Sequence, residues 1–252
     1  AGLVHRAFDR RLGRVVALKT LRAPGADALY RLKREFRTLA RLAHPNLVSF
    51  FDLVIEGDER FFTMELIEGA DFVETFRERL AAGEPTVAVH ADLRGAMLQL
   101  AAGLDALHRH GILHRDVKPG NVLIARDGRV VLLDFGLALD VSSDDDAPGT
   151  AGTMGYLAPE QLAGRGASIA SDWFGAGVML YETLTGRMPF EGETLLDVLS
   201  GKARRPAPPR MREPATPEDL DALALALLEI DPVRRPVGND VVARLAPGSG
   251  TA

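Results

Sequence analysis

The order of apolar and polar positions divides the chain into a β-rich beginning and a helical remainder. In the first 66 residues, short runs of β-branched and aromatic residues alternate with turn residues such as Gly13, a pattern typical of strands. Four strands are expected there, at residues 3–8, 14–21, 47–55 and 60–66. Between them, apolar residues recur every three or four positions over 27–43, which predicts an amphipathic helix that ends before Pro45.

From about residue 70 the pattern is helical. Three helices are expected, a long one around Leu93–Leu107, one over 173–184 that is apolar on nearly all sides and therefore buried, and one over 220–230. Short strands at 122–124 and 130–133 flank Asp127-Gly128, which favours a tight hairpin. The proline-rich stretch 206–217 is expected to be a loop.

These elements predict an α+β fold with two lobes. We expect one domain over 1–247, made of a β-rich N-lobe at 1–66, a hinge at 65–69 and a mainly helical C-lobe at 70–247. Residues 248–252 are expected to form a short tail.

Composition narrows the classes of function. The 252 residues are 46% hydrophobic and 26% charged, which is ordinary for a globular domain. A net charge of −5 without a basic stripe argues against a nucleic-acid partner. The absence of cysteine excludes disulfides and suits the cytoplasm. No apolar run approaches the ~20 residues of a membrane span. We therefore expect a cytoplasmic domain with no membrane segment in this chain.

Residues 114–121, His-Arg-Asp-Val-Lys-Pro-Gly-Asn, carry the most informative chemistry. Asp116 could orient an attacking hydroxyl and accept its proton, Lys118 could neutralise a transferring phosphate, and Asn121 could bind a metal ion. Phosphoryl transfer requires this combination of positioning and charge neutralisation. The alternative, a polar turn with a capping aspartate, accounts poorly for the complete eight-residue pattern.

Asp134-Phe135-Gly136 follows the second strand of the predicted hairpin. A carboxylate at the end of a strand is a suitable Mg²⁺ ligand, because Mg²⁺ takes few carboxylates together with phosphate oxygens. The alternative is a turn that ends the strand. Asp-Phe-Gly alone is a weak signal, but its position thirteen residues after Asn121 favours the metal-binding role.

With these motifs the chain resembles the protein kinases, specifically the eukaryotic-like serine/threonine kinases of bacteria, over essentially its whole length. Val16-Ala17-Leu18-Lys19 resembles the strand that carries the phosphate-binding lysine, and alternation places Ala17 and Lys19 on one face. Glu35 matches the helix glutamate that holds this lysine. The alternative for Glu35 is a solvated surface residue.

The resemblance also implies structural roles. Ala158-Pro159-Glu160 resembles the end of the activation segment that Asp134 opens, and Arg235 matches the arginine that pairs with Glu160. Asp172 resembles the buried aspartate that braces the catalytic loop. Three residues are expected to pack as a spine rather than act as acids or bases: Leu39, His114 and Phe135.

The same resemblance implies ATP and Mg²⁺ (or Mn²⁺) as cofactors and Ser- or Thr-bearing proteins as substrates. Lys19 and Asp134 would contact the phosphates, and Asn121 and Asp134 the metal. The adenine site would be formed by Met64 as gatekeeper, Glu65 and Ile67 as hinge contacts, Val4 and Ala17 as roof, and Leu123 as floor.

The beginning of the chain departs from the family pattern. Of the expected Gly-x-Gly-x-x-Gly-x-Val loop over the phosphates, only Gly2-Leu3-Val4 is present. We expect residues before Ala1 to supply the rest, and further domains to be fused outside this chain. The chain as given should bind ATP weakly, because the missing glycines allow backbone N–H groups to approach the phosphates.

Regulation is implied by Arg115, which precedes Asp116. In the family such an arginine receives a phosphorylated activation-loop residue, and autophosphorylation is expected. The candidate acceptors are Ser142, Ser143 and Thr150, whereas Thr153 is expected to serve the substrate-docking loop. The acidic run 144–146 could partly neutralise Arg115 without phosphate. The alternative is a solvated, disordered linker.

Three rival functions were weighed. Small-molecule kinases of the antibiotic-phosphorylating type lack an activation segment closed by Ala-Pro-Glu. Tyrosine kinases are disfavoured by Lys118 and by Gly152-Thr153 ahead of Tyr156. A non-enzymatic pseudokinase scaffold normally lacks the strand lysine or one of the two aspartates, and this chain retains all three. The sequence therefore predicts a serine/threonine protein kinase that acts in signalling.

Overall fold

The computed structural model describes residues 3–21, 26–56, 59–135, 151–190, 201–202 and 204–246. For residues 26–29, 31, 59 and 151–153 only the backbone is described. Several predicted positions lie outside the described residues: Gly2, Gly136, Ser142, Ser143, the acidic run 144–146 and Thr150.

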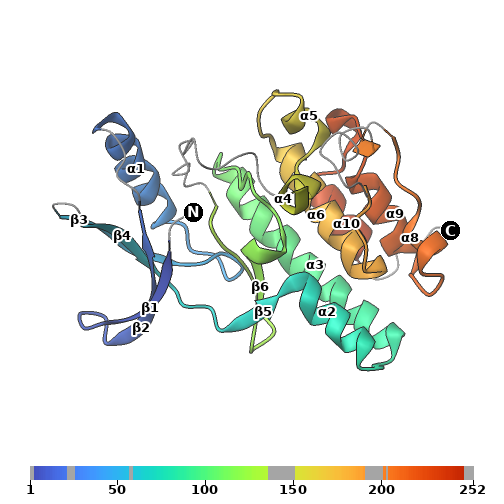
Figure 1. Cartoon of the computed structure of the whole chain (residues 1–252), viewed down its shortest axis with the longest axis horizontal. Helices are drawn as coiled ribbons and strands as arrows, with labels where there is room; N and C mark the ends of the chain where they lie inside the picture. Colours follow the sequence, from blue (N-terminus) through green and yellow to red (C-terminus); the bar gives the residue numbers. More distant parts are fainter. Residues whose placement is uncertain are drawn as a thin grey trace.

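The N-lobe is an antiparallel sheet with one helix beside it (Figure 1). Its strands are β1 (Val4–Asp9), β2 (Arg14–Thr20), β3 (Phe50–Glu56) and β4 (Glu59–Met64), in the order β1-β2-β4-β3, and the helix is α1 (Ala26–Leu39). All five predicted elements are present. The helix ends at Leu39 rather than 43, because tight turns follow in which the Leu42 N–H donates to the Leu39 carbonyl at 3.0 Å.

The C-lobe is mainly helical. Its helices are α2 (Phe72–Ala81), α3 (Thr86–Arg109), α4 (Ala151–Tyr156), α5 (Pro159–Leu162), α6 (Ile169–Thr185), α8 (Pro209–Arg212), α9 (Glu218–Leu227) and α10 (Asn239–Leu245), with single 3₁₀ turns η1 (Pro119–Asn121) and η2 (Pro232–Arg234). The three predicted helices correspond to α3, α6 and α9. Helix α8 corrects the prediction of a loop over 206–217. Proline at its first position is already suited to a helical turn.

A second, three-stranded sheet lies between the two groups of elements (Figure 1). It consists of β5 (Gly69–Asp71), β6 (Val122–Ala125) and β7 (Val130–Leu132), paired in that order. The sequence predicted β6 and β7 but not β5, because Gly69-Ala70-Asp71 consists of residues that are depleted in strands. Pairing across the fold creates β5, with Asp71 opposite Leu123.

Helix α6 forms the centre of the C-lobe, as its apolar sequence predicts. It begins at a reciprocal capping box between Ser168 and Ser171 and ends at Gly186, where φ is 70°. Gly175 lets α6 approach the catalytic loop, since a Cβ there would lie 2.6 Å from the Val117 carbonyl oxygen. The helix therefore sets the position of that loop.

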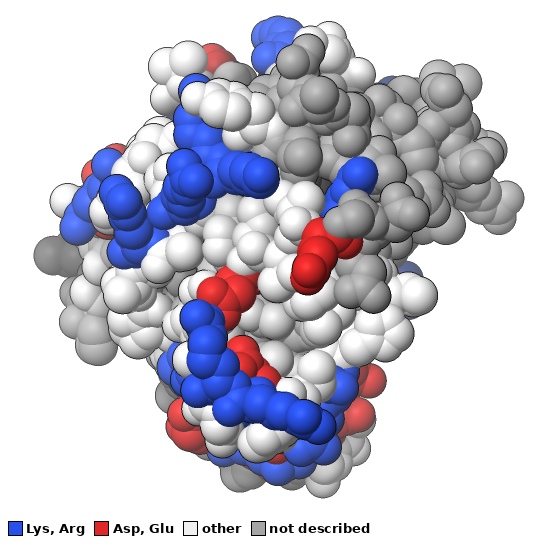
Figure 2. Space-filling view, turned by 90° about the vertical axis from the view of Figure 1, so that its left-hand side faces the viewer, with Lys and Arg blue, Asp and Glu red and all other residues white. Residues whose placement is uncertain are grey.

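Charge is unevenly distributed over the surface. Figure 2 faces the N-lobe and shows Lys and Arg side chains gathered in two areas, one over α1 and one over the turn between β1 and β2. Exposed residues of the first area include Lys33, Arg34, Arg37 and Arg41, and those of the second include Arg10, Arg11 and Arg14. This side of the N-lobe is therefore locally basic although the chain is acidic overall.

Among the described residues, no helix combines the length and the apolar character needed to span a bilayer.

A buried ion pair joins two parts of the C-lobe that lie 75 positions apart in the sequence. The Arg235 guanidinium donates to both carboxylate oxygens of Glu160, at 2.7 and 3.1 Å, and also to the Ala170 carbonyl at 2.7 Å. The two side chains are 0% and 5% exposed. The pair that the sequence predicted between these residues is thus present, and it fixes α5 against the segment after η2.

We expect Arg235→Ala to lower the free energy of unfolding by about 3–5 kcal/mol, because it leaves the buried Glu160 carboxylate uncompensated. Urea denaturation measures this loss. The control is Arg126→Ala, which removes an ion pair with Glu68 whose arginine is 81% exposed and should cost at most about 1 kcal/mol. Equal losses in the two variants would contradict the structural role of Arg235.

Candidate active site

The loop between α3 and β6 gathers three polar side chains. Lys118 Nζ lies 2.7 Å from Asp116 Oδ2. Asn121 donates through Nδ2 to the Asp116 backbone carbonyl and to Asp116 Oδ2, both at 2.8 Å. The 3₁₀ turn η1, which begins at Pro119, brings Asn121 back toward Asp116. The structure therefore unites the three residues that the sequence singled out.

Asp172, at the start of α6, fixes the backbone of this loop by hydrogen bonds. Its carboxylate accepts hydrogen bonds from the backbone N–H groups of His114 (2.9 Å) and Arg115 (2.8 Å). His108 Nε2 lies 2.8 Å from Oδ2, so its N–H is on Nε2, because a carboxylate only accepts. Arg115 has φ 74°, a left-handed conformation that costs a non-glycine residue free energy. The Asp172 carboxylate is what stabilises that conformation.

Asp134 lies beyond β7 and pairs with Lys19 of β2. The distance from Lys19 Nζ to Asp134 Oδ2 is 2.7 Å, and the side chains are 20% and 32% exposed. Asp134 has φ 55°. This left-handed turn ends the strand and directs the carboxylate toward β2. It is the second non-glycine residue of the described chain with positive φ, and both lie at this site.

The predicted contact between Lys19 and Glu35 is not present. Glu35 lies half-buried on α1, and no ion pair in the described part of the chain joins it to Lys19. In this structure the Lys19 ammonium group is directed to Asp134 instead, whose left-handed backbone brings its carboxylate to 2.7 Å. The geometry here thus corrects the predicted partner.

The expected packing role of the aromatic residues agrees with their surroundings. The His114 ring is 1% exposed and lies 6.2 Å from the Phe135 ring, which meets Phe50 edge to face at 5.5 Å. Burial lowers the pKa of His114 and keeps the ring neutral. Leu39 belongs to the same buried cluster. These residues connect the catalytic loop to the N-lobe sheet.

Comparison with known proteins identifies the family. A family model described as the protein kinase domain matches residues 1–244. The chain belongs to the protein kinase family. Similar bacterial proteins include the probable serine/threonine-protein kinase PknB of Bifidobacterium longum (36% identical over 90% of this chain), the serine/threonine-protein kinase PkaA of Streptomyces coelicolor (41% over 77%) and the serine/threonine-protein kinase PrkC of Bacillus subtilis (34% over 92%).

This kinase domain spans about a third of each of those relatives, 35%, 37% and 36% of their lengths respectively. The family and the two-lobed fold predicted from the sequence are confirmed.

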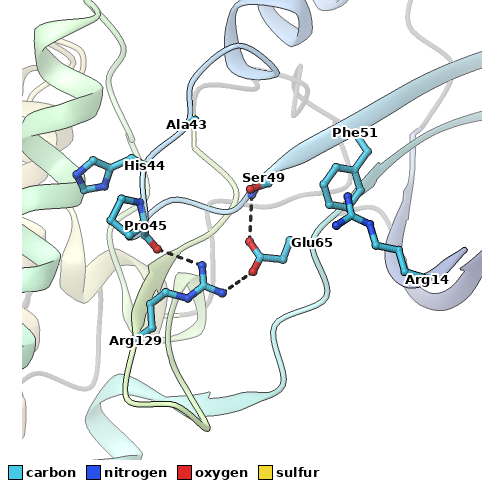
Figure 3. Close-up of a pocket in the computed structure, with 8 residues that line it drawn as sticks. All are labelled: Arg14, Ala43, His44, Pro45, Ser49, Phe51, Glu65 and Arg129. Atoms are coloured by element: carbon cyan, nitrogen blue, oxygen red, sulfur yellow. Dashed lines mark hydrogen bonds and ion pairs between the residues drawn. The ribbon is translucent and has the colours of Figure 1, made fainter. Parts of the chain in front are cut away.

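Glu65, at the start of the predicted hinge, is held by two other parts of the chain. It lines a hollow of about 460 Å³, and Figure 3 shows its carboxylate between Ser49 and Arg129. Glu65 accepts from the Ser49 N–H at 3.4 Å and pairs with Arg129, which also donates to the Pro45 carbonyl at 3.1 Å. Of the predicted nucleotide contacts, Glu65 alone lines this hollow, so the hollow is not the predicted adenine site.

The predicted adenine contacts lie on neighbouring elements. Ala17 and Met64 are opposite each other on β2 and β4 and are 3% and 5% exposed, whereas Val4 is opposite Lys19 and is 54% exposed. The Glu65 N–H already donates to the Ser49 carbonyl at 2.8 Å, so its carbonyl is the group available to adenine. Ile67 and Leu123 are half-buried. Their contacts with nucleotide remain predictions.

Two contributors to the site escaped the sequence analysis. The sequence indicated no role for His108, yet it supports Asp172. Lys202 was not considered, yet it is buried against the backbone that follows Thr153. A motif could not reveal either residue, because each acts on a partner more than 40 positions away in the sequence.

We expect Asp172→Asn to lower kcat at least tenfold and the free energy of unfolding by about 1–3 kcal/mol, because an amide offers one acceptor oxygen to three converging donors. Phosphorylation assays and urea denaturation measure the two effects. The control is Asp92→Asn on α3, whose side chain is 60% exposed and pairs with Arg79; it should leave kcat unchanged. A fully active Asp172 variant would show that the loop holds its own geometry.

Proposed function

We propose that this domain transfers the γ-phosphate of ATP to Ser or Thr hydroxyls of proteins. The observation that carries the proposal is the joined set of Asp116, Lys118 and Asn121, with Asp134 held by Lys19. The relatives bear the name serine/threonine-protein kinase, which supports the same reaction for this chain.

The donor atoms suit a hard divalent cation. Asn121 uses Nδ2 toward Asp116, which turns its Oδ1 away as an available oxygen ligand. Asp134 supplies a carboxylate. One carboxylate and one amide oxygen suit Mg²⁺, since this ion takes few protein ligands beside phosphate oxygens. Mg²⁺ or Mn²⁺, when bound, would neutralise phosphate charge.

The proposed reaction uses the side chains of the loop directly. The substrate hydroxyl oxygen forms a bond to the γ-phosphorus while the bond from phosphorus to the bridging oxygen of ADP breaks. The hydroxyl proton goes to the Asp116 carboxylate. Lys118, which contacts that carboxylate at 2.7 Å, lies where its ammonium group can also reach the transferring phosphoryl group. Positioning and charge neutralisation provide most of the catalysis.

The wider setting of this activity is also a proposal. We infer a cytoplasmic kinase domain fused to further domains, with Ser- or Thr-bearing proteins as substrates and no nucleic-acid partner. Arg115 lies next to Asp116 and has a left-handed backbone conformation. Its guanidinium group would bind an anionic group on the activation segment. Autophosphorylation of that segment would supply such a group.

We expect Asp116→Asn to lower phosphoryl transfer by at least a hundredfold, because an amide cannot accept the hydroxyl proton. Transfer from γ-labelled ATP, followed by phosphoamino-acid analysis, measures rate and specificity. The conservative control is Asp127→Asn in the β6–β7 turn, which should keep the parent's rate. Phosphotyrosine as the main product would refute the Ser/Thr specificity, and an active Asp116 variant would refute the mechanism.

We expect Lys19→Met to lower turnover by two or more orders of magnitude with little change in melting temperature, because the lost group binds charge in a partly exposed cleft. Glu35→Gln should lower turnover less, since the ion pair present is the one with Asp134. Thermal denaturation and steady-state kinetics test both. A Glu35 variant as inactive as the Lys19 variant would instead implicate the predicted Lys19–Glu35 pair.

A further inference from the structure

Lys202 is an ammonium group buried under the end of the activation segment. Its residue is 1% exposed. Its Nζ donates to the backbone carbonyls of Met154 and Gly155, both at 2.8 Å, and to that of Leu157. These three carbonyls belong to one short stretch, 45–48 positions earlier in the sequence. The side chain therefore gathers one segment of backbone around a single charge.

Carbonyl oxygens and aromatic rings provide the surroundings of this charge. Within the described residues no carboxylate forms an ion pair with Lys202. Its Nζ lies 5.4 Å from the centre of the Phe174 ring and 5.9 Å from that of Phe190, which favours a cation over the ring faces. Burial nevertheless lowers the pKa of Lys202 to about 7. An aliphatic residue would avoid this desolvation but would also remove the donor to these three carbonyls.

The segment that Lys202 holds leads directly into Ala158-Pro159-Glu160. On one side it is fixed by the hydroxyl of Tyr156, which donates to Glu182 of α6. On the other it is fixed by the buried pair of Glu160 and Arg235. Lys202 holds the Leu157 carbonyl, which lies between these two anchors, and the Met154 and Gly155 carbonyls, which precede both. The backbone from Met154 to Glu160 is thus supported at three places.

Helix α6 connects this support to the catalytic loop. Phe174 faces the Lys202 ammonium group, and the next residue, Gly175, lies so close to Val117 that a Cβ would be 2.6 Å from its carbonyl oxygen. Val117 follows Asp116, the proposed base. The segment over Lys202 and the loop that carries Asp116 therefore both contact the same turn of α6.

We propose that Lys202 is a positioning residue for the protein substrate: it sets the backbone of residues 154–157 as the platform on which the chain next to the phosphoacceptor docks. This inference rests on the proposed kinase activity. An ammonium group has three N–H donors, and all three are engaged here. A neutral amine has two, so loss of the proton releases one carbonyl and loosens the platform.

The pH dependence has a defined sign. Titratable groups on the elements around Lys202 are Tyr156 on α4, Glu160 on α5 with its partner Arg235, and Asp172 and Glu182 on α6. As pH rises through about 7, Lys202 loses its proton and the KM for the peptide substrate should rise. Global stability should instead rise over the same range, because an unfolded lysine keeps its proton to about pH 10 and the unfolded state then binds more protons than the folded state.

The test uses a library of Ser- and Thr-centred peptides, with the best peptide taken for kinetics between pH 6 and 8.5. We expect Lys202→Met to raise the peptide KM roughly tenfold, in keeping with the loss of hydrogen bonds from a charged donor. The KM for ATP and kcat should stay within about twofold of the parent's values. The inflection near pH 7 should vanish, and the preferred residues beside the phosphoacceptor should change. Lys33→Met, an exposed lysine on α1, is the matched control and should behave as the parent.

A second variant keeps the test decisive if Lys202→Met does not fold. Lys202→Arg retains a charge that does not titrate, so its peptide KM should be independent of pH across this range. An inflection near pH 7 in that variant would overturn the proposal. An unchanged peptide KM in Lys202→Met would also overturn it. So would a lower kcat with equal rises in the KM values for peptide and ATP and a lower melting temperature, because these changes together indicate a structural role alone. A parent protein that phosphorylates no peptide would instead refute the proposed function.

Discussion

The carboxylate of Asp172 determines the shape of the catalytic loop. It is 2% exposed, and three donors converge on it from α3 and from the loop itself. The loop contains a left-handed arginine and a single 3₁₀ turn, neither of which is stable in isolation. The position of Asp116 therefore depends on α6, and α6 in turn depends on being apolar and buried along nearly its whole length.

Two buried cations support the end of the activation segment in different ways. Arg235 neutralises a carboxylate through two parallel hydrogen bonds, a geometry that fits a planar guanidinium. Lys202 instead donates to carbonyl oxygens in the last turn of α4 and just beyond it. In both cases buried polar atoms require donors, and the donors come from a part of the chain that lies far away in sequence. The segment is thereby held in one conformation.

The sequence predicted best those elements whose pattern is long or whose chemistry is local. The periodic apolar positions of α3 and α6 and the turn at Asp127-Gly128 are readable because each depends on neighbouring residues. Strand β5 was missed because it exists only by pairing with β6. By contrast, the eight-residue loop motif predicted Asp116, Lys118 and Asn121 as one group, and the structure brings them within hydrogen-bonding distance.

The sequence by itself determined the family, the two-lobed fold and the residues available for phosphoryl transfer, because these follow from motifs and periodicity within short stretches. Only the tertiary structure decided which charges meet. It joined Lys19 to Asp134 rather than Glu35, placed His108 beneath the catalytic loop, and buried Lys202 against three carbonyls. An ion pair or a buried hydrogen bond depends on distances of a few ångströms between segments remote in sequence, and spacing along the chain does not specify those distances.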